Sequence, residues 1–181
     1  MSGDPTGEVR ELRHAATSLG ILHERGKQGW PLADVYRQLS NPQLYLHAYG
    51  RISRNPGAMT PGITDETVDG MSLAKIASLI DDLRHERYQW KPVRRVYIEK
   101  KNSTKKRPLG VPTCSDKLRQ EVLRLMLEAY DEPQFNRYSH GFRPKRGGHT
   151  ALRESYHRWV GTKWFIAGDI PACCDSLNPT V

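Results

Sequence analysis

The residues best suited to chemistry are two aspartates near the end of the 181-residue chain. Asp169 follows the apolar run 164–167, and Asp175 lies six residues further on. A carboxylate at the end of a buried strand is costly unless water or a cation binds it, and Mg²⁺ prefers oxygen ligands of this kind. Asp169 is therefore a candidate Mg²⁺ ligand, although the residues alone favour an ordinary turn aspartate after a strand.

A second candidate is the segment from Lys91 to Arg107, where eight basic residues stand against a single acid, Glu99. The periodicity predicts two strands, 93–98 and 107–111, joined by a turn. Because side chains alternate along a strand, we expect Arg95, Tyr97 and Glu99 on one face of this hairpin, and Arg94, Val96 and Ile98 on the other. Cations on such a ribbon can follow a phosphate backbone, or they can simply keep an exposed turn in solution. The eight cations are Lys91, Arg94, Arg95, Lys100, Lys101, Lys105, Lys106 and Arg107.

The third candidate is the glycine- and proline-rich loop from Ser139 to Gly148. It carries Arg143, Lys145 and Arg146, and Phe142 could anchor it against the rest of the protein. Such a loop could follow a nucleic-acid backbone or merely connect two helices, and the residues alone favour neither.

Helical periodicity and turn residues indicate the elements that position these candidates. We expect a flexible or weakly helical lead-in over residues 1–30, a loop over 55–71, and a helix after 72 and another after 115, with Ser72 and Ser115 as their caps. Further helices are expected at 32–39, 44–52 and 149–160, and a buried strand at 164–169. The fold class predicted is α/β, in its α+β form.

Composition narrows the range of functions. The chain has 28 Lys and Arg against 20 Asp and Glu, a net charge of +8, and a pI near 9.5, which favours a polyanionic partner. No apolar run is long enough for a membrane span, so no membrane partner is expected. The odd count of three cysteines suits a reducing compartment, which predicts a cytoplasmic protein. The sequence lacks the motifs of P-loop, dinucleotide-binding and zinc-protease sites.

Several blocks of the sequence, in order, resemble the N-terminal portion of group II intron-encoded reverse transcriptases, also called maturases. Each block alone is moderately specific, whereas the same blocks in one order and spacing are highly specific. The matching blocks are 49–62, 67–72, 94–98, 106–112, 116–120, 139–144 and 168–170, with Tyr88, Pro92, Lys100 and Lys101 between them.

The resemblance implies the fingers and the start of the palm of a right-handed polymerase. Residues 31–160 would form the N-terminal extension and a helix-rich fingers subdomain with the basic hairpin, and residues 161–181 would begin the palm with its first strand. Asp169 would be a catalytic carboxylate and a ligand of Mg²⁺. Lys100 and Arg107 would bind the triphosphate of the incoming nucleotide, beside Ile170 and Cys174. The expected RNA-binding residues are Arg94, Arg95, Lys105, Lys106, Arg143 and Arg146.

This chain departs from the family pattern at identifiable positions. Glu99 stands where the family usually has proline, and the following turn is one residue longer. After Asp169 the family pattern is Asp-Ile-Lys-Gly-x-Phe-Asp, whereas this chain has Asp-Ile-Pro-Ala-Cys-Cys-Asp, which places Cys174 at an aromatic position. The Tyr-x-Asp-Asp motif, which would supply the other catalytic carboxylates, occurs nowhere in the 181 residues.

The resemblance therefore predicts the N-terminal part of an RNA-directed DNA polymerase with maturase-type RNA binding. Its partners would be group II intron or template RNA, a DNA primer and deoxynucleoside triphosphates. By itself the chain should be catalytically incomplete. Two alternatives stay open: a module that binds RNA and assists splicing without catalysis, and a degenerate open reading frame without activity.

Overall fold

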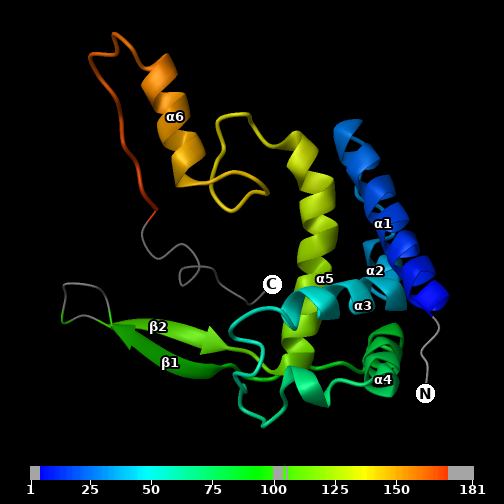
Figure 1. Ribbon diagram of the computed structural model, residues 1–181. Helices are drawn as coiled ribbons and strands as arrows, with labels where there is room; N and C mark the ends of the chain where they lie inside the picture. Colours follow the sequence, from blue (N-terminus) through cyan, green and yellow to red (C-terminus); the bar gives the residue numbers. More distant parts are fainter. Residues whose placement is uncertain (1–4, 100–103, 105, 171–181) are drawn as a thin grey trace. The chain divides into compact units, whose positions relative to one another are not determined.

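The computed structural model describes residues 5–99, 104 and 106–170, and for residues 5–13 it describes the backbone only. The chain divides into two compact units, with the boundary after Phe135. Figure 1 shows the elements of each unit along the chain. Because the two units are separate bodies, each is described by itself.

The first unit is a small helical core that carries a hairpin. Helix α5 (Cys114–Asp131) packs against α1 (Pro5–Lys27) and α3 (Pro42–Ile52), and α3 also contacts α4 (Leu73–Arg84). A single turn, α2 (Val35–Gln38), precedes α3, and short 3₁₀ turns cover Val68–Gly70 and Glu132–Gln134. Each of these helices has apolar side chains at helical spacing along one face, and these faces pack together and exclude water. The fully buried residues of this core include Leu44, Tyr45 and Ala48 of α3 and Leu118, Val122 and Met126 of α5.

Side-chain caps set where these helices begin. The Ser72 hydroxyl accepts a hydrogen bond from the Lys75 amide (3.2 Å), as predicted for the start of α4. Helix α5 starts two residues earlier than expected, because Thr113 rather than Ser115 is its cap: the Thr113 hydroxyl accepts from the Asp116 amide at 3.3 Å. Ser115 instead contacts a loop, with consequences described below.

The lead-in over residues 1–30 is helical rather than flexible in most of its described part. Residues 5–27 form α1, whose 23 residues make it the longest helix of the described chain. Ala15 and Leu22 are buried in the core and Leu19 packs against it, so the helix has an apolar stripe that faces the core. Ala15 is fully buried and Gly26 lies against the backbone of α5, and such small residues give little hydrophobic signal in the sequence.

The predicted basic hairpin is confirmed. Strands β1 (Arg94–Glu99) and β2 (Lys106–Val111) pair antiparallel, with Tyr97 opposite Pro108 and Glu99 opposite Lys106. They form a two-stranded sheet (Figure 1). Val111, at the end of β2, is buried at the root of the hairpin, whereas most of the hairpin's other residues are exposed.

The second unit contains the loop after Asn136 and helix α6 (Gly148–Arg158), close to the predicted helix at 149–160. The buried strand expected at 164–169 is absent from the described residues, where this segment is extended coil with Trp164, Phe165 and Ile166 largely exposed. A strand needs a neighbour to accept and donate its backbone hydrogen bonds, and no described strand pairs with this one. Helices and a two-stranded antiparallel sheet confirm the α+β class.

None of the described helices has both the length and the apolar content to cross a lipid bilayer.

Candidate nucleic-acid interface

Three exposed cations of the hairpin strands are available for an external partner. They are Arg95, Lys106 and Arg107. The side chain of none of the three forms a hydrogen bond or ion pair with another residue in the described part of the chain. Because opposite residues of an antiparallel pair lie on the same face, Lys106 shares a face with Arg95, whereas Arg107 lies on the other face with Arg94.

Arg94 is placed differently from these cations. Its Nε and Nη2 atoms both donate to the carbonyl oxygen of Pro61, at 3.2 and 2.9 Å. The same loop touches the other root of the hairpin at Gly62, where an added Cβ would lie 2.8 Å from the backbone of Pro112 and Thr113. Arg94 therefore fixes the start of β1 to the loop 55–67, and only the remainder of its guanidinium is open to a ligand.

Two side chains of α5 and its N-terminal turn fasten this loop. Lys117 Nζ donates to the carbonyl oxygens of Thr60 (2.7 Å) and Gly57 (3.3 Å). Glu66 accepts from both the amide (3.0 Å) and the hydroxyl (2.7 Å) of Ser115, and it forms an ion pair with Lys75. Burial acts to raise the pKa of Glu66, but the hydrogen bonds from Lys75 and Ser115 outweigh it and hold that pKa below its usual value. Glu66 is thus an anion at the N-terminus of α5, where the helix dipole stabilises negative charge.

A buried polar cluster joins the two roots of the hairpin. Asp116 is fully buried and accepts hydrogen bonds from the Tyr88 hydroxyl, which precedes β1, and from the Thr113 hydroxyl (2.7 Å), which follows β2. The guanidinium of Arg119, 2% exposed, lies over the Tyr88 ring and donates to the Leu79 carbonyl oxygen at 3.0 Å. Burial and the hydrogen bond to Asp116 raise the pKa of Tyr88, so its hydroxyl remains a donor.

Sequence patterns alone did not predict this cluster. Arg119 lies between Leu118 and Val122 on the apolar stripe of α5, and a charged residue at a core position of an amphipathic helix is the signal that could have revealed it.

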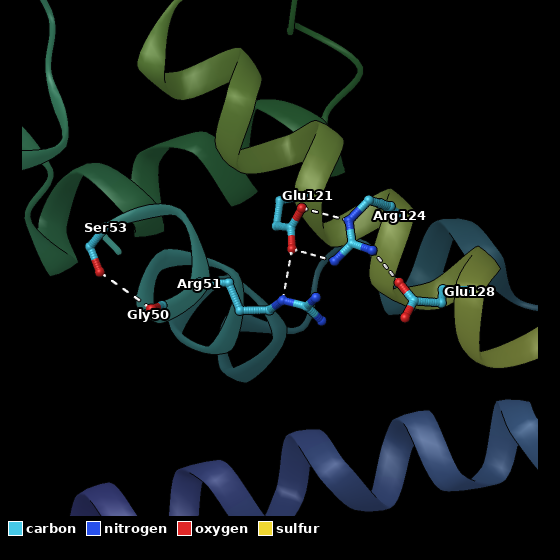
Figure 2. A network of polar contacts seen from close by, with 6 residues as sticks. All are labelled: Gly50, Arg51, Ser53, Glu121, Arg124 and Glu128. Carbon is cyan, nitrogen blue, oxygen red and sulfur yellow. Dashed lines mark hydrogen bonds and ion pairs between the residues drawn. The ribbon is translucent and has the colours of Figure 1, made fainter. Parts of the chain in front are cut away.

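A second network of charged side chains joins α3 to α5, and its glutamates pair with its arginines. In Figure 2, Glu121 accepts from Arg124 at 2.7 and 2.8 Å and pairs with Arg51 at 3.2 Å. Arg124 also pairs with Glu128, and the Ser53 hydroxyl donates to the Gly50 carbonyl oxygen nearby. A cavity of about 370 Å³ lies beside this network. Because two glutamates compensate the two arginines, this surface offers no net charge to a phosphate.

The loop of the second unit uses its arginines to hold its own shape. Arg143 Nη1 donates to the carbonyl oxygens of Asn136 and Ser139, both at 2.9 Å. Arg146 Nη1 donates to the Arg137 and Ser139 carbonyl oxygens. Phe142 is fully exposed, so the expectation that it anchors the loop is wrong.

The described residues place no cluster of ligands around Asp169. Asp169 and Ile170 are exposed in coil, and no group of three or more His, Cys, Asp or Glu side chains in the described ranges is arranged to hold a metal ion. Lys100, Lys105 and Cys174 lie outside the described residues, as does Asp175.

Comparison with known proteins gives several relatives. No protein-family model matches the chain. It is 49% identical to the group II intron-encoded protein LtrA of Lactococcus lactis over 144 residues, which are 80% of this chain and 24% of that protein. It is 47% identical to an uncharacterized 91 kDa protein in the cob intron of Schizosaccharomyces pombe, over 97% of this chain and 22% of that protein. Nuclear intron maturase 1 of Arabidopsis thaliana matches over 70 residues at 37% identity, covering 39% of this chain and 10% of that protein. The chain thus spans about a quarter of the length of the first two relatives.

Proposed function

Because this chain is a homologue of the group II intron-encoded proteins and intron maturases, we propose that it provides the RNA-binding N-terminal part of a group II intron reverse transcriptase. In that arrangement its helical core and hairpin are the fingers, and residues 161–181 begin the palm. The observation that carries the proposal is the exposed hairpin of this chain. It presents three cations whose side chains have no partner among the described residues. Its partner would be intron RNA, and the protein would act in the cytoplasm.

The residue roles follow from where the side chains stand. Arg95 and Lys106 are exposed, and their side chains have no partner among the described residues, so they would contact RNA phosphates. Lys105, which precedes Lys106 in sequence, would do the same. Arg107, on the other face, would bind the triphosphate of a nucleotide together with Lys100. Arg94, Arg143 and Arg146 already donate to backbone carbonyls, so we assign them to shaping the RNA-binding surface as well as touching it. Ile170 and Cys174 would lie beside the nucleotide.

The first prediction concerns the salt dependence of RNA binding. Replacing Arg95, Lys106 and Arg107 together with glutamine should reduce the slope of log affinity against log salt by about 1.4, because Arg95 and Lys106 would each neutralise one phosphate of single-stranded RNA and each such contact adds roughly 0.7 to that slope. The measurement is a fluorescence titration with intron RNA at several salt concentrations.

The matched control removes the same charge from cations that are already ion-paired. Lys27, Arg87 and Arg158 form ion pairs with Glu24, Asp81 and Glu154, so their replacement with glutamine should leave the slope nearly unchanged. Equal slopes for the two triple variants would contradict an RNA-binding hairpin.

Catalysis requires more than this chain shows. Asp169 is the one candidate metal ligand among the described residues, and a single carboxylate does not fit the two-metal arrangement of nucleotidyl transfer, where two ions lie about 3.5–4 Å apart. Mg²⁺ dehydrates reluctantly and tolerates little geometric error. When bound, Mg²⁺ would polarise phosphoryl oxygens, and we propose that its further ligands come from outside the described part of the chain.

The second prediction is that the isolated 181-residue chain binds RNA without extending a primer. A purified chain with an RNA template, a DNA primer, deoxynucleoside triphosphates and excess Mg²⁺ should give no elongated product, because no Tyr-x-Asp-Asp carboxylates are present. Extension that disappears in Asp169→Asn would contradict this prediction.

A second candidate function is a module that binds intron RNA and assists splicing without polymerising, which the exposed cations Arg95, Lys106 and Arg107 would serve equally well. Faster splicing of intron RNA on addition of the chain would favour this function. A chain that neither binds RNA nor promotes splicing would behave as a degenerate reading frame.

A further inference from the structure

The hairpin presents two chemically different faces, and the face away from Arg107 combines cations with an aromatic ring. Its register puts Arg95, Tyr97, Lys106 and Pro108 on that face. The opposite face carries Arg107 with the apolar side chains of Val96, Ile98 and Leu109. Tyr97 is 58% exposed and Ile98 48% exposed, so neither face is covered by the described residues.

We propose that the Arg95–Tyr97–Lys106 face binds an unpaired stretch of RNA, with a base stacked on Tyr97 and phosphates on Arg95 and Lys106. This inference rests on the proposed RNA-binding function and adds to it a residue, Tyr97, and a substrate class, single-stranded RNA. It separates the RNA-binding face from the nucleotide-binding face that carries Arg107.

The three side chains form a row with the ring in the middle. Residues two apart on a strand are about 6.6–6.8 Å apart, which is the separation expected between Arg95 and Tyr97. Lys106 is diagonal to Tyr97 across the ladder, at a typical distance of about 7–8 Å. The residue opposite Arg95 is Gly110, and the uncharged Val93 side chain lies where a Cβ of residue 110 would stand. The ring thus has a positive charge on either side of it.

Stacking on an exposed ring requires a base that is not already paired and stacked in a duplex. Proteins read unpaired RNA by stacking bases on aromatic rings, and they read duplex RNA mainly by shape and backbone contacts. A row with one cation on each side of one ring therefore favours a single strand.

One acid belongs to the same face and gives a further test. Glu99 stands opposite Lys106 but forms no ion pair with it. A carboxylate at this position repels an RNA phosphate and lowers the affinity of the face. Its replacement by glutamine should therefore strengthen binding.

The experiment compares binding of the full chain to a fluorescent oligouridine and to a blunt-ended RNA duplex of the same length. Tyr97→Ala should weaken oligouridine binding about tenfold, since one stacked base contributes on that scale. Tyr97→Phe should bind like the wild type, because it keeps the ring. Ile98→Ala, the matched exposed apolar residue on the other face, should also bind like the wild type. Circular dichroism spectra confirm that each variant folds.

Stacking also predicts which properties do not change. Tyr97→Ala should leave the salt slope and the affinity for the duplex unaltered, whereas Glu99→Gln should tighten oligouridine binding. Equal losses in Tyr97→Ala and Ile98→Ala, or no loss in Tyr97→Ala, would overturn the stacking face while the proposed RNA binding stands. Failure of the proposed function is a different result: an unchanged salt slope after Arg95, Lys106 and Arg107 are neutralised.

Discussion

Replacing Asp116 with alanine should lower the free energy of unfolding by about 3–5 kcal/mol, the scale of a broken buried charge cluster. The carboxylate is fully buried and accepts from the hydroxyls of Tyr88 and Thr113. Its removal leaves both donors without their acceptor. Burial lowers the pKa of Arg119, and the neighbouring Asp116 charge opposes that shift, so the variant also leaves this cation in the core without its anion. Urea-induced unfolding followed by circular dichroism measures the loss.

Two variants separate the buried cluster from a general loss of charge. Asp116→Asn keeps an acceptor and the side-chain volume, so its cost should be smaller, about 1–3 kcal/mol. Glu128→Ala removes an acid from the same helix, but its side chain is 27% exposed and pairs with Arg124 at the surface, where a pair contributes at most about 1 kcal/mol. Equal losses in Asp116→Ala and Glu128→Ala would show that the buried cluster contributes nothing special.

The cluster also connects stability to the RNA-binding surface. Tyr88 lies before β1 and Thr113 after β2, so Asp116 holds both roots of a hairpin that is exposed on its two faces. A two-stranded hairpin has marginal stability alone. Loosening its roots should therefore lower RNA affinity even though Asp116 does not touch RNA.

Much of the fold could be predicted because it depends on local patterns. The Ser72 cap, the apolar stripe of α5 and the alternation of the hairpin strands are each set by a few neighbouring residues. Helix α1 was missed for the opposite reason. Gly26 faces Tyr130 of α5 across more than a hundred residues of sequence, Ala15 is fully buried, and small residues of this kind give little sign of burial.

The candidate site shows the same division. The exposed cations Arg95 and Lys106 could be predicted from the basic run 91–107 and its strand periodicity, whereas Arg107 would be expected to have its side chain held in place. A sequence does not show whether a cation is free to bind a phosphate or already donates to a backbone carbonyl oxygen. Arg94 is an example, because it donates to Pro61, 33 residues away in sequence. The strand expected before Asp169 failed because a strand depends on a partner that its own residues do not encode.

Replacing Gly26 with alanine should destabilise the first unit by about 1–3 kcal/mol, as overpacking of a close-packed interface does. Helix α1 lies so close to α5 at this point that an added Cβ would stand 1.9 Å from the carbonyl oxygen of Tyr130 and 2.9 Å from its carbonyl carbon. These are backbone atoms, so no change of rotamer relieves the overlap. The two helices must move apart, and that displaces a carbonyl oxygen to which Gln134 donates at 3.1 Å.

Gly20 of the same helix supplies the control, because it has open space around it. An added Cβ there meets nothing within 4 Å, so Gly20→Ala should stabilise the protein by about 0.5–1 kcal/mol through the helix propensity of alanine. That same propensity favours Gly26→Ala, but the gain is smaller than the cost of separating α1 from α5. Thermal unfolding of the two variants side by side should therefore shift in opposite directions. A Gly26→Ala protein as stable as Gly20→Ala would show that α1 does not pack on α5 at this distance, and that the N-terminal segment is as loosely held as its sequence suggests.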